Sequence, residues 1–160
     1  MATFTDAPAV FHRAIAYTIF GSLLTRRKYR CVLQGGSPPR WTNLWVLLVG
    51  DSGEGRKSTA VRMAETILTE VDATLRAPDD GSPEGFLQEL RTKDRSNHDA
   101  STILVRPEFS TLLATFKRSY ALSLKPLLMD FYDVPNTFKK TLSKTSFELS
   151  KPRVAMLGAI

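Results

Sequence analysis

The fold of this chain is decided by residues 44–59, which read LWVLLVGDSGEGRKST. Residues 44–49 form a continuous apolar run, and its length and glycine-rich end predict a strand buried on both faces. From residue 57 to residue 73 the apolar positions follow the i, i+3, i+4, i+7 spacing of an amphipathic helix. A buried strand, a glycine loop and an amphipathic helix in this order form half of a parallel α/β unit.

The loop between this strand and this helix carries the residue types that bind a triphosphate. Glycines allow positive φ angles, so that successive backbone N–H groups can point at phosphate oxygens. Lys57 can reach the β- and γ-phosphates, and Ser58 offers a hydroxyl to Mg²⁺. We therefore expect ATP and Mg²⁺ to bind here, with Lys57 as a catalytic residue and with contacts from Gly50, Ser52, Gly53, Glu54, Gly55, Arg56, Lys57, Ser58 and Thr59.

The loop differs from the usual pattern G-x-x-x-x-G-K-[ST] at Arg56. Gly50 and Gly55 have the usual separation, but Arg56 is inserted before Lys57. Either the loop is one residue longer, with Arg56 bulged outward or onto phosphate, or the loop is anchored on Lys57 and the glycines are shifted. We favour the anchored lysine because Ser58 follows it correctly. A glycine-rich turn without a ligand is the alternative.

A second candidate residue, Glu108, follows an apolar strand expected at residues 102–105. P-loop ATPases carry an acid at the end of a neighbouring strand, where it orients Mg²⁺, and an adjacent glutamate can polarise the attacking water. Pro107 stands where the metal-binding aspartate is expected. We therefore predict that Glu108 polarises water. Whether Glu108 also contacts the metal is left open by the sequence. The alternative is that Glu108 only stabilises the start of the next helix.

The rest of the chain continues the α/β alternation. Asp6, Ser82 and Ser110 are expected to cap helices, the first of which spans residues 9–24. Its expected apolar face comprises Val10, Ala14, Tyr17 and Leu24, widened by Ile15, Ile19 and Phe20. Further strands are expected at 74–77, 145–149 and 154–157, a polar loop at 94–100, a β-hairpin around residues 138–144 and a helical stripe at 124–132.

These patterns predict an α/β fold in which helices sandwich a parallel sheet, as in P-loop NTPases. We expect an N-terminal helical segment and linker at residues 1–40 and the NTPase core at residues 41–160. Because the last expected strand ends beside the last residue, we expect this core to be truncated at its C-terminus.

The formal net charge is +6 and the pI is near 9.7, so a nucleic-acid partner is expected, with simple solubility as the alternative. Lys139, Lys140 and Lys144 beside Phe138 suit single-stranded nucleic acid, but an ordinary exposed hairpin fits equally well. Cys31 is the only cysteine, and we expect it to be a buried thiol. No apolar run approaches the roughly 20 residues of a membrane span, so we expect a cytoplasmic protein without a membrane partner.

Residues 43–50, with Gly53 and the run Arg56-Lys57-Ser58-Thr59, resemble a family of P-loop ATPase domains from phage, plasmid and mobile-element replication proteins. The resemblance continues in residues 105–113, 127–138 and 152–160. It implies a RecA-like or AAA+-like core that hydrolyses ATP and works on DNA, as a helicase-like homo-oligomeric ring. It also implies a sensor residue after the last strand and an arginine finger further on, neither of which can be assigned in this chain.

Two other classes of function stay open. A P-loop kinase would phosphorylate a small molecule, and it would need a lid and an acceptor pocket. A catalytically weak nucleotide-binding or DNA-binding module would explain why the usual pair of acids is incomplete at Pro107 and Glu108.

Overall fold

The computed structural model describes residues 6–32, 35, 38–51, 56–78, 82–97, 99–142 and 145–160. The predicted loop residues Ser52, Gly53, Glu54 and Gly55 lie outside the described residues, and so does Lys144. The helices of the described part are α1 (Ala9–Arg26), α2 (Lys57–Asp72), α3 (Pro83–Asn97), α4 (Phe109–Phe116) and α5 (Leu124–Tyr132), with short 3₁₀ turns η1 (Ala73–Leu75) and η2 (Ser119–Ala121). The strands are β1 (Arg30–Cys31), β2 (Arg40–Trp41), β3 (Trp45–Leu48), β4 (Ser101–Arg106), β5 (Thr137–Leu142), β6 (Thr145–Ser150) and β7 (Arg153–Ala159).

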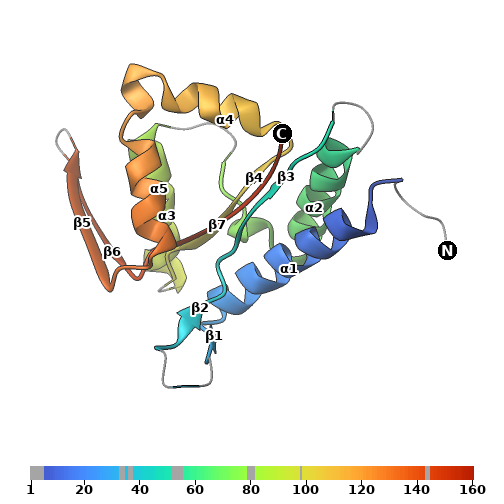
Figure 1. The fold of residues 1–160 in the computed structure, drawn as a ribbon. Coiled ribbons are helices and arrows are strands. Elements are labelled where there is room, and N and C mark those ends of the chain that lie inside the picture. Colours follow the sequence, from blue (N-terminus) through green and yellow to red (C-terminus); the bar gives the residue numbers. More distant parts are fainter. Residues whose placement is uncertain are drawn as a thin grey trace.

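A three-stranded parallel sheet with the order β3–β7–β4 forms the centre of the protein (Figure 1). Leu48 at the end of β3 pairs with Ala159, and Arg106 at the end of β4 pairs with Gly158. The carboxyl ends of all three strands therefore meet at one edge of the sheet. The fold class is mixed α/β, with a parallel sheet flanked by helices.

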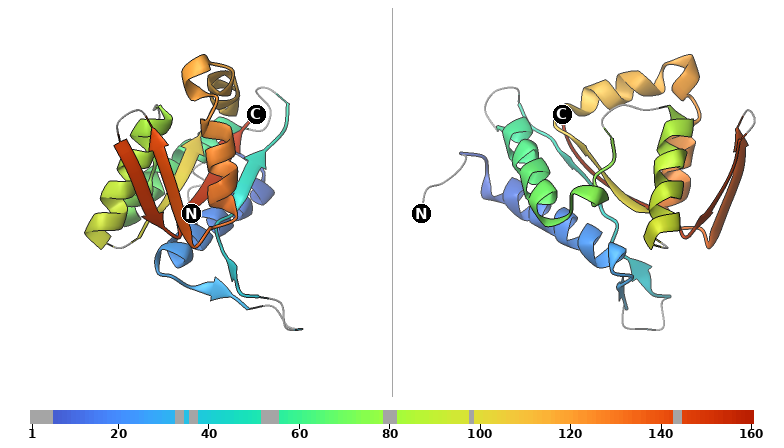
Figure 2. Two further views of the ribbon diagram at one scale, coloured as in Figure 1. Left: turned by 90° about the vertical axis from the view of Figure 1, so that its left-hand side faces the viewer. Right: turned by 180° about the vertical axis from the view of Figure 1, so that it is seen from behind.

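Both faces of the central strand β7 are covered, because its side chains alternate between two core clusters. Val154 and Met156 belong to the cluster with α3 and α5. Ala155 and Leu157 belong to the cluster with α1 and α2. Figure 1 shows the sheet between these two groups of helices, and Figure 2 shows the same layers from the side and from behind. The prediction of a third buried strand is confirmed, since every residue of β7 is buried.

The prediction that the first strand is buried on both faces is wrong. Only Leu48 of β3 is buried, whereas Trp45 is 37% and Leu47 is 42% exposed. The reason is topological: within the described sheet β3 pairs with β7 alone, so its other edge is open. An apolar run indicates that a strand packs against apolar side chains, but it does not show whether the strand lies at the edge or in the centre of the sheet.

The buried face of α1 also differs from the expected one. Val10, Tyr17 and Phe20 are exposed. The hydroxyls of the buried face are satisfied within the helix, as where Ser22 Oγ donates to the Thr18 carbonyl at 2.7 Å. A Cβ on Gly21 would lie 2.5 Å from the Thr42 carbonyl oxygen, so the glycine allows the chain before β3 to approach closely. The buried residues are Ile15, Thr18, Ile19, Gly21, Ser22 and Thr25.

Of the three predicted helix caps, only Ser82 is confirmed. Its Oγ accepts a hydrogen bond from the Gly85 N–H at 3.2 Å, in the first turn of α3. The N-cap of α1 is Pro8 rather than Asp6, and the N-cap of α4 is Glu108 rather than Ser110. Because neither of these helices has a side-chain cap hydrogen bond, the polar residues near their starts are available for other contacts.

The remaining boundaries shift modestly. Helix α3 continues to Asn97, so it occupies the first half of the loop expected at 94–100. In the strand expected at 74–77 only Arg76 pairs with the sheet, through a parallel bridge to Ile103 of β4. The stripe at 124–132 and the β5–β6 hairpin are confirmed. Cys31 is exposed, which contradicts the expected buried thiol, because β1 belongs to a small separate sheet with β2.

Candidate functional site

Lys57 is the first residue of α2, and its ammonium group lies over the chain that leaves β3. Nζ donates to the Gly50 carbonyl at 2.5 Å and to the Asp51 carbonyl at 2.8 Å. These carbonyls follow the carboxyl end of β3, which is where ligands bind in parallel α/β sheets. The ammonium group therefore lies against the backbone that leaves β3, beside the start of α2.

Arg56, the N-cap of α2, has the backbone conformation that favours glycine. Its φ is 41° and its ψ is 34°, in the left-handed region. A residue in this conformation beside a helix start turns successive N–H groups toward one side, which is how backbone nests bind anions. Its guanidinium points away to Asp6, at 3.1 Å. The backbone of Arg56 thus takes the place of the glycine that usually precedes the lysine, which favours the register anchored on Lys57.

The first turn of α2 supplies backbone donors at the same place. The N–H groups of Lys57, Ser58 and Thr59 precede the first intrahelical hydrogen bond of α2, from the Ala60 N–H to the Arg56 carbonyl at 3.0 Å. N–H groups without an intrahelical partner and the positive end of the helix dipole both favour an anion at a helix start. The Lys57 ammonium group and the N–H groups at the start of α2 therefore lie at the same edge of the sheet.

Ser58 and Glu108, which are 50 residues apart in the sequence, are in direct contact. The Ser58 hydroxyl donates to Glu108 Oε1 at 2.7 Å. Glu108 follows β4, and β7 separates β4 from β3, so the ends of β3 and β4 are about 10 Å apart. The contact spans this gap and brings together the two side chains predicted to face Mg²⁺.

This contact bears on the alternative role of Glu108. Although Glu108 is the N-cap of α4, its side chain makes no cap hydrogen bond with that helix. The helix start is tied instead by Thr111, whose hydroxyl donates to the Glu108 carbonyl at 2.7 Å. The carboxylate is therefore directed toward Ser58, and capping does not account for it.

A hydroxyl and a carboxylate are hard oxygen ligands of the kind that Mg²⁺ accepts. Mg²⁺ is usually bound through one or two protein oxygens, with phosphate oxygens and water completing its shell. Ser58 and Glu108 fit such a partial ligand set, and no cluster of three His, Cys, Asp or Glu side chains occurs in the described part of the chain. The site suits a metal that arrives with a phosphate ligand rather than one held by protein alone.

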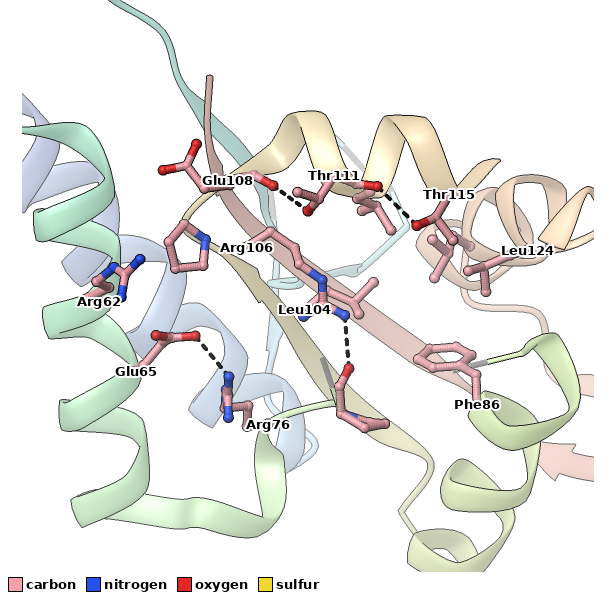
Figure 3. A pocket seen from close by; sticks show the side chains of 14 residues that line it. Arg62, Glu65, Arg76, Phe86, Leu104, Arg106, Glu108, Thr111, Thr115 and Leu124 are labelled. Carbon is pink, nitrogen blue, oxygen red and sulfur yellow. Dashed lines mark hydrogen bonds and ion pairs between the residues drawn. The ribbon is translucent and has the colours of Figure 1, made fainter. Parts of the chain in front are cut away.

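Sequence reasoning missed a cavity of about 440 Å³ beside Glu108 (Figure 3). Arg62 of α2 and Arg106 of β4 line it, together with Pro107. Arg106 is 8% exposed, and its guanidinium donates to the Val105 and Pro78 carbonyls, each at 2.8 Å. An arginine that directly continues an apolar strand was the available signal for this cavity.

Phe138, the aromatic residue expected beside the basic hairpin, and Trp41 of β2 are both engaged in the protein itself. Phe138 packs edge-on against Phe131, with ring centroids 4.8 Å apart. The Arg153 guanidinium carbon lies 4.4 Å from the Trp41 ring centroid. Lys139 forms an ion pair with Glu148 at 2.9 Å. The described part of the hairpin therefore resembles an ordinary exposed hairpin more than a stacking platform.

Comparisons with protein-family models, with curated proteins and with solved structures gave no match to this chain. The geometry of Lys57, the start of α2, Ser58 and Glu108 is therefore the structural basis for a functional conclusion. In the described segments, none of the helices combines the length and apolar content needed to cross a membrane.

Proposed function

We propose that this chain is the nucleotide-binding core of a P-loop ATPase that acts on nucleic acid. The observation that carries the proposal is the convergence of the Lys57 ammonium, the start of α2 and the Ser58–Glu108 pair at the carboxyl edge of one parallel sheet. A triphosphate needs this combination of a cation, backbone donors and a metal-binding hydroxyl.

Each residue of the site has a distinct role in this proposal. Lys57 would exchange its two carbonyl partners for phosphate oxygens and neutralise charge on the γ-phosphate. Ser58 and Glu108 would hold Mg²⁺, which would supply charge neutralisation for the phosphates. Because the Glu108 carboxylate is exposed and accepts a hydrogen bond from the Ser58 hydroxyl, it is suited to accept one from a water molecule and orient it for attack on the γ-phosphate.

The coupling to nucleic acid rests on the basic composition and on the family resemblance. A net charge of +6 favours association with a polyanion. The resemblance adds DNA as the substrate, replication of a mobile element or phage as the process, the cytoplasm as the location and a homo-oligomeric ring as the assembly. These belong to the proposal, and the geometry of the site bears only on the ATPase part.

The test is phosphate release by the full-length protein, with and without single-stranded DNA. Wild type is expected to release phosphate in the presence of ATP and Mg²⁺, and DNA is expected to accelerate it. Lys57→Ala should lower the rate by at least about a hundredfold, since one lost transition-state cation costs on the order of 10²–10³ in rate. Lys125→Ala, which removes an exposed lysine from α5, is the matched control and should leave the rate unchanged.

Two further variants separate binding from chemistry. Glu108→Gln is expected to retain ATP affinity while losing turnover, and Ser58→Ala is expected to lose the Mg²⁺ dependence of binding. Unchanged turnover in Lys57→Ala would refute the proposed mechanism. Phosphate transfer to a small molecule would assign the chain to the kinases instead, and ATP binding without any turnover would make it a nucleotide-binding module.

A further inference from the structure

The cavity beside Glu108 lies along β4, and none of the described residues of the predicted phosphate loop lines it. It opens between α2, the segment around Arg76 and Pro78, the end of β4 and helices α3, α4 and α5. Its volume of about 440 Å³ falls in the range of about 300–1,000 Å³ found for small-molecule pockets. The cavity therefore has the size for a ligand as large as a nucleoside monophosphate.

One side of the cavity is cationic. Arg62, Arg76 and Arg106 line it together with two carboxylates, Glu65 and Glu108. Glu65 forms an ion pair with Arg76 at 2.8 Å, so these two charges offset each other. Figure 3 shows the Arg62 side chain extending from α2 into the region between Glu65 and the end of β4. Arginine guanidinium groups bind phosphate through paired hydrogen bonds, which makes this side suited to a phosphate group.

Arg62 is the most available of these cations. Its side chain is exposed, and its guanidinium forms no hydrogen bond or ion pair within the part of the chain that the structure describes, whereas Arg76 is paired with Glu65. It lies one turn after Ser58 on α2, on the helix that also carries Lys57. A phosphate bound by Arg62 would therefore lie next to the nucleotide site without sharing its lysine.

The opposite side of the cavity is apolar. Phe86 and Leu87 of α3 are buried in the same core cluster, and Phe86 also faces the cavity. The leucines that line the cavity are Leu104, Leu112, Leu124 and Leu128. An aromatic ring and aliphatic side chains opposite a cationic wall suit a ligand with a flat apolar part and an anionic end.

We propose that this cavity is a second ligand site, which binds a small phosphate monoester of nucleotide size with its phosphate against Arg62. The site adjoins the phosphate loop because Glu108 lines the cavity and also accepts the Ser58 hydrogen bond. A ligand in the cavity thus lies beside the carboxylate assigned to the attacking water. Binding in the cavity does not require the proposed ATPase activity, so the two can be tested apart.

The experiment is isothermal titration calorimetry of the full chain with 5′-AMP and, separately, with dTMP, in the absence of ATP and Mg²⁺. Arg62→Gln should weaken binding by about ten- to a hundredfold, as expected for a lost charge-assisted hydrogen bond. Thr115→Phe, which places a ring in the cavity from the half-buried position on α4, should abolish binding. Arg95→Gln removes an exposed arginine from α3 and is the matched control.

A crossed pair of measurements separates this site from the phosphate loop. Lys57→Ala should leave AMP binding unchanged, and Arg62→Gln should leave ATP binding unchanged. Thermal unfolding of each variant shows whether it is folded, and the exposed Arg62 keeps the test valid if Thr115→Phe is unstable. Competition of AMP by a 5′-phosphorylated oligodeoxynucleotide would identify the end of a strand as the source of the phosphate, and absence of competition would identify a free nucleotide.

The proposal is overturned if neither monophosphate binds at millimolar concentration. It is also overturned if binding survives both Arg62→Gln and Thr115→Phe, or if binding disappears in Lys57→Ala, since the monophosphate would then occupy the phosphate loop.

Discussion

The left-handed backbone of Arg56 gives the sharpest test of how the phosphate loop joins α2. A side chain at φ 41° costs about 1–2 kcal/mol, which glycine avoids. Glycine in turn loses about 0.5–1 kcal/mol through the greater freedom of the unfolded chain. Arg56→Gly should therefore be more stable than Arg56→Ala by about 1 kcal/mol. Both changes remove the ion pair with Asp6, so that contribution cancels in the comparison.

The measurement is urea unfolding of both variants, with Asp6→Asn as the control. The Arg56–Asp6 pair is 56% and 73% exposed at its two side chains, so Asp6→Asn should cost at most about 1 kcal/mol. A difference of about 1 kcal/mol between the Arg56 variants corresponds to about 2–4 °C in Tm for a chain of this size. Arg56→Gly should also keep ATP affinity, because the backbone N–H groups and Lys57 are retained.

The opposite order of stability would refute this reasoning. If Arg56→Gly unfolds more easily than Arg56→Ala, residue 56 does not have a left-handed backbone. The loop would then not be anchored on Lys57, and the glycines would have to be assigned to the longer register.

Three further predictions concern the framework around the site. Gly21→Ala should destabilise the protein by about 1–3 kcal/mol in urea unfolding, because the new Cβ would lie 2.5 Å from the Thr42 carbonyl oxygen. The control is Gly85→Ala, whose new Cβ meets only ordinary contacts and which should be neutral or stabilising by up to about 1 kcal/mol. Asp99→Asn should cost about 3–5 kcal/mol because it leaves the buried Arg153 without its carboxylate, and a loss below about 1 kcal/mol would contradict the buried ion pair. Burial lowers the pKa of Lys93, so between its folded pKa and about 10.4 the unfolded chain binds more protons than the folded chain, and the free energy of unfolding should rise with pH. Lys93→Met should flatten this rise when unfolding is measured from pH 8 to pH 10. An equally steep rise in the variant would contradict the prediction.

The sequence predicted those parts of the fold that depend on local pattern. Helix α2 follows directly from its apolar spacing, and the start of α3 follows from Ser82. The buried strands β4 and β7 follow from short runs of aliphatic residues. In each case the signal lies within a few residues of the element that it predicts, which is why these predictions are confirmed.

The errors arose where the outcome depends on distant partners. Leu47 is exposed because β3 lies at the edge of the described sheet, and strand order is not encoded in the run itself. The buried face of α1 is set by close approach of the chain at Thr42, for which Gly21 was the only local sign. Small and hydroxyl-bearing residues can face a core when their hydroxyls bond within the helix, as Ser22 does, and a count of apolar residues overlooks such a face.

The candidate site divides in the same way. Lys57 and Ser58 could be predicted, because the loop and the helix start are contiguous in the sequence. The cavity beside them could not be predicted as a whole, since it depends on how α2, α3 and α4 are placed around the end of β4, and Arg106 after an apolar strand was its only local sign. The left-handed conformation of Arg56 was also inaccessible, although the inserted residue marked the position as unusual.

The contact between Ser58 and Glu108 depends on a strand that belongs to neither motif. Strand β7 enters between β3 and β4, and it thereby sets the separation of the two strand ends that carry the site. Gly158 lies near the end of β7, where a Cβ would be 2.6 Å from a ring carbon of Phe109 and 3.2 Å from Leu47. The missing side chain lets Phe109, the first residue of α4, lie against the sheet, and Glu108 immediately precedes it. The position of the carboxylate is therefore determined partly by a glycine 50 residues further along the chain, which explains why loop and acid motifs alone indicate the residues of the candidate site but not its geometry.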